Sequence, residues 1–326
     1  MTNSDQSRDT RVTIGEIRDM FEALSNWGRW SGNDHLGTLN YVTDQKRVEA
    51  AKLVESGVSV SCAWDIGFFN PVGNLVAPQR WMTDSGLGEN DPESPAGPLS
   101  DDGHQRSSSE FISMVFHGLS MTHLDALSHM YWEGRMYGGL PASYVTEREG
   151  ATVHDVLSAA GGIQTRGVLL DIAAVLGYES LPLDFNIFPD DLETAEAAAK
   201  VTVSSGDVLL MRTGDGKRRQ EGGWDPDVNG QPGLHPSCLP WLHAREVAAI
   251  GLDGPQEVHP SPSPEVTWPF HSVAIAAMGL WLIDNCQLED LAQMCRSRNR
   301  WTFMMTIAPM RLDGATGSPV NPIALF

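Results

Sequence analysis

The segment Thr122-His123-Leu124-Asp125-Ala126-Leu127-Ser128-His129 gathers ligand-type side chains in a chain where histidine is otherwise sparse. Only 10 of 326 residues are histidine, yet His117, His123 and His129 fall within thirteen residues, with Asp125 among them. His123 and Asp125 are two apart, so an extended strand directs both side chains to one face. Asp125 and His129 are four apart, so a helix that followed would again place them on one face. The spacing therefore predicts a strand-to-helix junction at which two imidazoles and a carboxylate converge.

The apolar neighbours of this cluster indicate that it is buried: Leu119, Met121, Leu124, Leu127 and Met130. Burying imidazoles and a carboxylate costs several kcal/mol unless they are paired or bind a metal. These are also the ligands that zinc, manganese and iron(II) take in sites with an open position. A hydrogen-bonded His–Asp pair is the commoner explanation of one such pair, but the density of the cluster favours a metal site.

Further ligands must come from distant segments. His271 and Asp284 are polar residues that interrupt the apolar stretches TWPFHSVAIAAMG and GLWLIDNCQLEDL. Asp253 ends a predicted strand in GLDGP, where it is either an active-site carboxylate or a turn-forming residue before Gly254.

The rest of the chain mixes strands and helices without an evident linker, which predicts an α/β or α+β class around a single sheet-based core. We expect a mobile tail at 1–14 and one domain over 15–326. The helical patterns lie at 17–24, 43–57, 187–200, 240–246 and 272–282, and the predicted strands lie at 58–62, 111–116, 167–171, 208–212, 248–252 and 303–309. The strand at 111–116 is expected to be buried. Residues 84–110 are rich in Gly, Pro, Asp and Ser, so they form an exposed loop, either a functional lid or an ordinary insertion.

Composition excludes several classes of function. Acidic residues outnumber basic ones 42 to 22, for a net charge of −20 and a pI near 4.7, so a nucleic-acid partner is not expected. No apolar run of about eighteen residues predicts a membrane span. The polar N-terminus lacks a secretory signal, so a cytoplasmic location is expected. The four cysteines show no CxxC spacing and are expected to be buried thiols.

Around Thr122–His129, His271 and Asp284 the sequence resembles the cyclase family of metal-dependent hydrolases, which includes bacterial kynurenine formamidases and isatin hydrolases. The family pattern is HxGTHxDxxxH, followed much later by a His and, twelve or thirteen residues on, a Glu. Thr122 to Asp125 match the THxD core, and His129 matches the terminal His. His271 and Asp284, thirteen apart, fall at the later pair. The segments WGRWSGNDHLGTLN, GLDGP, LEDLA and RLDGATGSPVNPIALF also look like family segments, so the resemblance extends from about residue 26 to the C-terminus.

The sequence departs from that pattern at two positions. The family's first His falls on Leu119, which cannot bind a metal, and His117 lies two residues earlier as a replacement ligand or a supporting contact. The late Glu is Asp284, shorter by one methylene, which puts a second metal ion in doubt.

The resemblance implies a swivelling β/β/α-type single domain with a central mixed sheet packed by helices, and a homo-oligomer (dimer or tetramer). It implies that His123 and Asp125 hold a divalent ion, Zn or Mn, and that His271 and Asp284 complete one or two sites. It further implies that water activated by the metal hydrolyses an amide, often cyclic, or a lactone of a small-molecule substrate. His129 would be the proton donor and acceptor.

Trp27 and Trp30 lie in the aromatic turn near the N-terminus. The resemblance suggests that they wall the substrate pocket, whereas packing on the core would explain them equally well.

Three other functions are compatible with parts of the pattern. His123, Asp125 and His271 would suit an iron(II), 2-oxoglutarate-type oxygenase, but no Arg follows His271 at about ten residues to bind the co-substrate. A non-catalytic metal- or ligand-binding relative is compatible with the missing His at position 119. Only the acidic surface favours an interaction module. The sequence contains no GxSxG elbow, Walker loop or strand-linked GxGxxG.

Overall fold

Four apolar segments form the centre of the sheet in the computed structural model, which describes residues 10–32, 34–67, 77–85, 107–119, 121–222 and 229–326. They are β7 (Ile163–Asp171), β9 (Val208–Arg212), β11 (Ala249–Leu252) and β12 (Trp281–Asp284), and they pair in parallel in that order. Parallel strands covered on both faces read as continuous apolar runs, and residues of β9, β11 and β12 are all buried.

Antiparallel strands extend this core on both sides. Beyond β7 lie β13 (Thr302–Ile307), β15 (Ile323–Leu325) and β1 (Ser59–Ser61), and beyond β12 lie β4 (His123–Asp125) and β14 (Gly317–Pro319). The nine-stranded order is β1-β15-β13-β7-β9-β11-β12-β4-β14. The predicted class, a single α/β domain with a central mixed sheet packed by helices, is confirmed.

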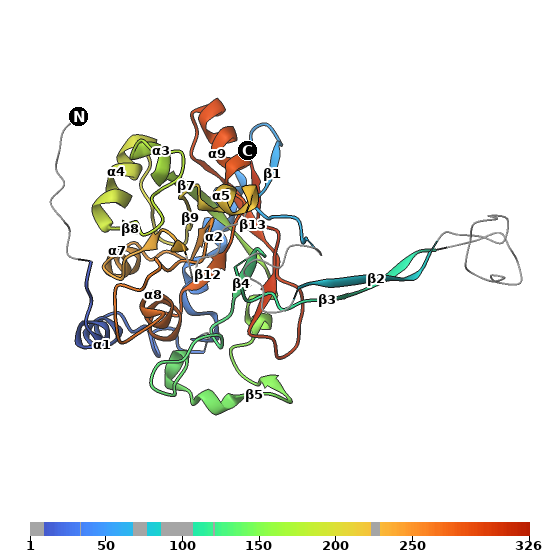
Figure 1. Ribbon diagram of the computed structural model, residues 1–326, viewed down its shortest axis with the longest axis vertical. Helices are drawn as coiled ribbons and strands as arrows, with labels where there is room; N and C mark the ends of the chain where they lie inside the picture. Colours follow the sequence, from blue (N-terminus) through green and yellow to red (C-terminus); the bar gives the residue numbers. More distant parts are fainter. Residues whose placement is uncertain (1–9, 33, 68–76, 86–106, 120, 223–228) are drawn as a thin grey trace, which may run out of the picture.

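Helices and short ribbons surround the sheet (Figure 1). The helices are α1 (Ile14–Ala23), α2 (Asp44–Ala51), α3 (Ile172–Val175), α4 (Pro189–Ala199), α5 (Asp215–Glu221), α7 (Cys238–Ala244), α8 (Pro269–His271) and α9 (Glu289–Arg298). A π-helical segment, η5 (Ser272–Ala277), continues α8, and the 3₁₀ segments are η1 (Asp34–Tyr41), η2 (Tyr137–Gly139), η3 (Ala142–Tyr144) and η4 (Val156–Ala159). The two-stranded ribbons are β2 (Gln79–Asp84) with β3 (Ser109–Ser113), β5 (Val145–Thr146) with β6 (Gly150–Ala151), and β8 (Asn186–Ile187) with β10 (Gly233–Leu234).

Helix α1 begins at a capping box that ties the N-terminal segment to the body. The Oγ1 of Thr13 accepts from the N–H of Glu16, whose carboxylate accepts from the N–H of Thr13. Val12 is buried, and its N–H donates to the carbonyl of Pro262. Of the expected tail at 1–14, residues 1–9 lie outside the described part of the chain, and 10–14 lead directly into α1. Thr43 caps α2, because its Oγ1 accepts from the N–H of Lys46.

Three local predictions are wrong. The segment 111–116 is not a buried strand: β3 ends at Ser113, pairs only with β2, and is exposed over most of its length in a ribbon that projects from the body (Figure 1). No helix follows His123–Asp125, because the chain closes a turn in which the N–H of His129 donates to the carbonyl of Ala126.

The helix expected over 272–282 ends earlier. Gly279, at φ +66°, reverses the chain before β12, and a Cβ there would lie 2.6 Å from the ring of Tyr137. No helix was predicted at α9, which follows β12. The loop expected at 84–110 falls mostly on residues 86–106, outside the described part of the chain.

Two further expectations concern burial and the membrane. All four cysteines are buried and free, as predicted. Within the described ranges, no helix is both long and apolar enough to cross a bilayer.

Candidate metal centre

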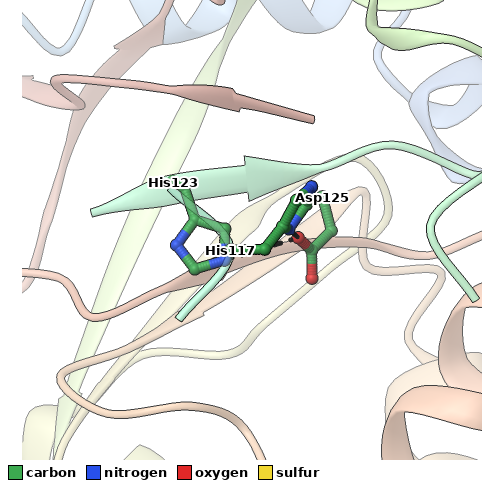
Figure 2. A group of neighbouring side chains, drawn as sticks. All are labelled: His117, His123 and Asp125. Atoms are coloured by element: carbon green, nitrogen blue, oxygen red, sulfur yellow. Dashed lines mark ion pairs between the residues drawn. The ribbon is translucent and has the colours of Figure 1, made fainter. Parts of the chain in front are cut away.

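Strand β4 places two of the expected ligands in the middle of the cluster. The Nε2 of His123 lies 3.5 Å from Asp125 Oδ1, and His117 approaches the same oxygen with Nδ1 at 3.0 Å (Figure 2). On the other oxygen, His271 Nε2 lies 3.8 Å from Asp125 Oδ2 and 3.4 Å from Asp284 Oδ2. Two ligand trios therefore share Asp125. The first half of the centre consists of His117, His123 and Asp125, and the second half consists of Asp125, His271 and Asp284.

The register of the sheet brings these distant segments together. β4 lies antiparallel between β12 and β14, with His123 opposite Asp284 and Asp125 opposite Gly317. Because Asp284 ends β12 and His123 begins β4, the two residues meet at one end of the strand pair. His271 arrives from α8, the short helix that precedes β12 in the sequence.

Residues outside the motif hold the loop that carries His117. The side-chain amide of Asn285 donates to the carbonyls of Gly118 and Met121, and the guanidinium of Arg219 donates to the carbonyl of Leu119. Leu119 thus uses its backbone carbonyl to accept the hydrogen bond from Arg219 that helps to hold this loop. The His at 117, rather than a residue at 119, faces Asp125.

His129 closes the cluster on its more exposed side. Its Nε2 lies 3.9 Å from Asp125 Oδ1, and its side chain is 27% exposed. Its ring stacks on that of His117, with centroids 3.9 Å apart and planes 4° apart. The turn after β4 therefore places His129 beside Asp125, although the predicted helix does not form.

Among the described residues, none donates a hydrogen bond to the carboxylate of Asp125. The residue is 1% exposed, both of its oxygens are buried without a partner, and the approach of His117 Nδ1 is not aligned as a hydrogen bond. An unpaired buried carboxylate is costly, and a cation between Asp125 and the imidazoles removes that cost.

The donor atoms themselves fit a divalent metal. His123 Nδ1 lies 2.8 Å from the carbonyl of Met121, so this nitrogen carries the proton and Nε2 presents its lone pair to the cluster. Ligands at about 2.1 Å from one tetrahedral ion lie about 3.4 Å apart, and the ion-pair separations within the two trios, 3.0 to 3.8 Å, lie on both sides of that value.

The pKa values of Asp125, in the first half of the centre, and of His129 beside it are set by burial and by neighbouring charges. Burial alone raises the pKa of Asp125, but the imidazoles of His129, His117 and His123 outweigh it and hold the pKa of this carboxyl well below its usual range. Burial lowers the pKa of His129 to about 4, against the opposing effect of Asp125. Asp125 is therefore an anion at neutral pH, and His129 is a neutral base.

The second half carries more negative charge. Burial lowers the pKa of His271, but Glu257 and Asp284 outweigh it and raise this pKa well above its usual value. Two carboxylates on one imidazole thus favour a positive charge at this position, which a bound cation supplies as well as a proton does.

Sequence reasoning missed two residues that support the second half. Gln256 donates from Nε2 to Asp284 Oδ1 at 3.0 Å, and Glu257 accepts from His271 Nδ1 at 2.6 Å. Both follow GLDGP, but nothing in the local pattern distinguishes them from loop residues.

Other candidate residues lie in different surroundings. Asp253 accepts hydrogen bonds from Thr213 and Gly214, so it anchors the turn after β9. Trp27 donates from Nε1 to the carbonyl of Ala276, and Trp30 packs edge-on against Tyr41. These contacts fix both tryptophans in the body of the protein, and their contact with substrate stays a prediction.

A cavity of about 470 Å³ is lined by the residues that follow His129 and flank His271. Its walls include Met130, Tyr131, Trp132 and Trp268. The ring of Trp268 lies 6.1 Å from that of His271, centroid to centroid.

Comparison with known proteins agrees with this architecture. The family model Cyclase, described as "Putative cyclase", matches residues 47–257. A crystal structure described as a novel cyclase is 31% identical, with a TM-score of 0.81, and the match covers 93% of this chain and all of that one. The chain belongs to the Cyclase family.

More distant relatives share the fold. Isatin hydrolase A from Labrenzia aggregata, bound to benzyl benzoate, is 19% identical with a TM-score of 0.57, over 84% of this chain and 94% of that one. A predicted metal-dependent hydrolase from Bacillus stearothermophilus is 16% identical with a TM-score of 0.51, over 83% and 98%. No curated protein matches the sequence.

Proposed function

We propose that this Cyclase-family protein is a metal-dependent hydrolase that cleaves an amide, including a cyclic one, or a lactone. The observation that carries the proposal is the buried carboxylate of Asp125, which lacks a hydrogen-bond donor among the described residues and is approached by Nε2 of His123, Nε2 of His271 and Nδ1 of His117. The isatin hydrolase description of structural neighbours supports the same reaction class.

The residues of the site divide the work. His117, His123 and Asp125 would hold one divalent ion, and Asp125, His271 and Asp284 a second or the same one. When bound, such an ion, zinc or manganese, polarises the scissile carbonyl and lowers the pKa of water, so that hydroxide is available as the nucleophile.

His129 moves the proton in this scheme. Its Nε2 faces Asp125, and the low pKa keeps the ring neutral, so Nε2 accepts a proton from the attacking water. The same nitrogen returns the proton to the leaving nitrogen or oxygen. The pocket whose walls include Met130, which follows His129, and Ser272, which follows His271, would hold the substrate.

The oxygenase alternative is less well supported. His123, Asp125 and His271 do lie together, but Asp284 adds a second carboxylate that a two-histidine, one-carboxylate triad does not need. Turnover without oxygen and 2-oxoglutarate separates the two reactions.

We also propose that the protein acts as a homo-oligomer. The β2–β3 ribbon carries Trp81, Met82, Phe111 and Ile112 with 43% to 50% of their surface exposed. An isolated two-stranded ribbon is marginally stable in water, so contact with a second copy would stabilise it.

A panel of N-formyl amines, cyclic amides and lactones, assayed with added zinc or manganese, tests the proposed reaction. We expect hydrolysis by the parent chain and a loss of orders of magnitude in His129→Ala, with its metal content unchanged. Asp125→Ala should be metal-poor, because both trios use this residue. Full metal occupancy in Asp125→Ala would reject the ligand assignment, and full turnover in His129→Ala would reject the proton-transfer role.

A further inference from the structure

Glu257 is a buried carboxylate whose hydrogen bonds converge on one ligand. It is 1% exposed and lies in the segment between β11 and α8. Its Oε1 accepts from the N–H of Phe270 at 2.6 Å and of His271 at 3.1 Å, and its Oε2 accepts from Nδ1 of His271 at 2.6 Å. One side chain thus holds both the backbone and the ring of His271.

These three hydrogen bonds from Phe270 and His271 to Glu257, here called the clamp, determine which ring nitrogen of His271 can bind a cation. Donation from Nδ1 to a carboxylate keeps a proton on Nδ1, so the lone pair that a cation would take is that of Nε2. Nε2 is the atom that lies 3.4 Å from Asp284 and 3.8 Å from Asp125. Turning the ring would break the 2.6 Å bond and deprive a buried carboxylate of a donor, which is unfavourable.

The two halves of the centre are held differently. His123 donates from Nδ1 to a neutral carbonyl, that of Met121 at 2.8 Å, whereas His271 donates to a full negative charge. A charged acceptor makes an imidazole a stronger ligand. The half around His271 also contains Asp284, so it concentrates more negative charge than the half around His117.

We propose that Glu257 is the positioning residue of this centre, and that through His271 it makes the trio of Asp125, His271 and Asp284 the tighter cation site. The proposal rests on the metal-dependent function proposed above. A cation should therefore bind first at this trio, and His117 and His123 should matter less for its affinity.

A purely structural role for Glu257 makes different predictions. By accepting from the N–H groups of Phe270 and His271, it would only cap the start of α8. Its removal would then lower stability without changing the affinity or the geometry of a bound cation.

The test compares Glu257→Gln and Glu257→Ala with a matched control, Glu196→Gln. Glu196 is also a buried glutamate that accepts from a backbone N–H, that of Val203, and it pairs with Arg245 away from the cluster. Affinity for Co²⁺ and Mn²⁺ is measured by competition with a chromogenic chelator, and unfolding is followed in the metal-free protein. The Co²⁺ absorption spectrum reports the ligand geometry.

We expect affinity to fall about 10-fold in Glu257→Gln and about 100-fold in Glu257→Ala, within the range for residues that support metal ligands. The Co²⁺ spectrum should change in Glu257→Gln and stay unchanged in Glu196→Gln. His117→Ala should weaken the first cation less than Glu257→Ala does. Parent-like affinity and spectrum in Glu257→Gln, with only a lower unfolding temperature, would overturn the proposal.

Two further measurements keep the inference separate from folding and from the reaction. In the zinc-loaded parent protein, nitrogen-15 spectra of the histidines should show His271 protonated at Nδ1, and protonation at Nε2 instead would overturn the clamp. If Glu257→Gln binds the cation about 10-fold more weakly than the parent and the parent hydrolyses no amide or lactone, the positioning role stands and the proposed reaction fails.

Discussion

A single methyl group at position 317 should test the ligand role of His117 without replacing a ligand. Gly317 opens β14 directly opposite Asp125. A Cβ built there would lie 2.5 Å from the carbonyl oxygen of Leu124 and 2.7 Å from Cε1 of His117. Gly317→Ala therefore forces either the strand or the imidazole to move.

The required movement is large for a metal site. Ordinary contact begins near 3.4 Å, so the new methyl group and the His117 ring must separate by a further 3.4 − 2.7 = 0.7 Å. Metal–ligand distances tolerate only about 0.2 Å. Overpacking of this kind costs about 1–3 kcal/mol, and 1.4 kcal/mol corresponds to about tenfold in an equilibrium constant. We therefore expect binding of a cation by His117, His123 and Asp125 to weaken roughly 10- to 100-fold.

The assay is metal competition on Gly317→Ala, with urea unfolding of the metal-free protein in parallel. Gly161→Ala is the matched control, because a Cβ at 161 meets no atom within 4 Å and the backbone there lies outside the left-handed region. If Gly317→Ala bound metal and unfolded as the parent does, the close contact with His117 would not constrain the site, and the reasoning would be refuted.

Three further predictions concern metal removal, thiol chemistry and assembly. A chelator should lower the unfolding temperature, and zinc or manganese at about 100 times Kd should restore about 2.7 kcal/mol of stability, whereas a transition independent of both would argue against a metal centre. Burial raises the pKa of Cys62 and of Cys295 to about 12, so these buried thiols stay protonated at pH 8; an alkylating reagent should modify them far more slowly in the native protein than in urea, and equal rates would contradict this. Light scattering should show a multiple of 35.5 kDa that decreases in a Trp81→Ser, Phe111→Ser variant but not in Val48→Ser, and a monomeric parent would contradict the assembly.

The parts of the fold that could be predicted from sequence are those determined by local patterns. The apolar runs at 208–212 and 248–252 became β9 and β11, and Thr43 caps α2 as its side chain allows. The prediction at 111–116 was wrong because an apolar run alone does not reveal its partner: β3 pairs only with β2, away from the core.

In the candidate site, too, the features set by local spacing could be predicted and those set by distant contacts could not. The spacing of His123, Asp125 and His129 was sufficient to predict that they converge, although the chain uses a turn in place of a helix. Glu257 could not be predicted, because it reaches His271 across 14 residues of irregular chain, and no periodicity relates the two.

The register of β4 explains why the short motif needs the whole domain. A slip of one residue against β12 would reverse the faces of His123 and Asp125, placing Leu124 toward the ligands. Thr122 opposes such a slip, because its Oγ1 donates to the carbonyl of Asn285 at 2.7 Å, just beyond the end of β12. The threonine of the motif therefore acts on the sheet rather than on the metal. Thr122→Val, which keeps the shape and removes the donor, should lower metal affinity and stability together, whereas Glu257→Gln should lower metal affinity without an equal loss of stability.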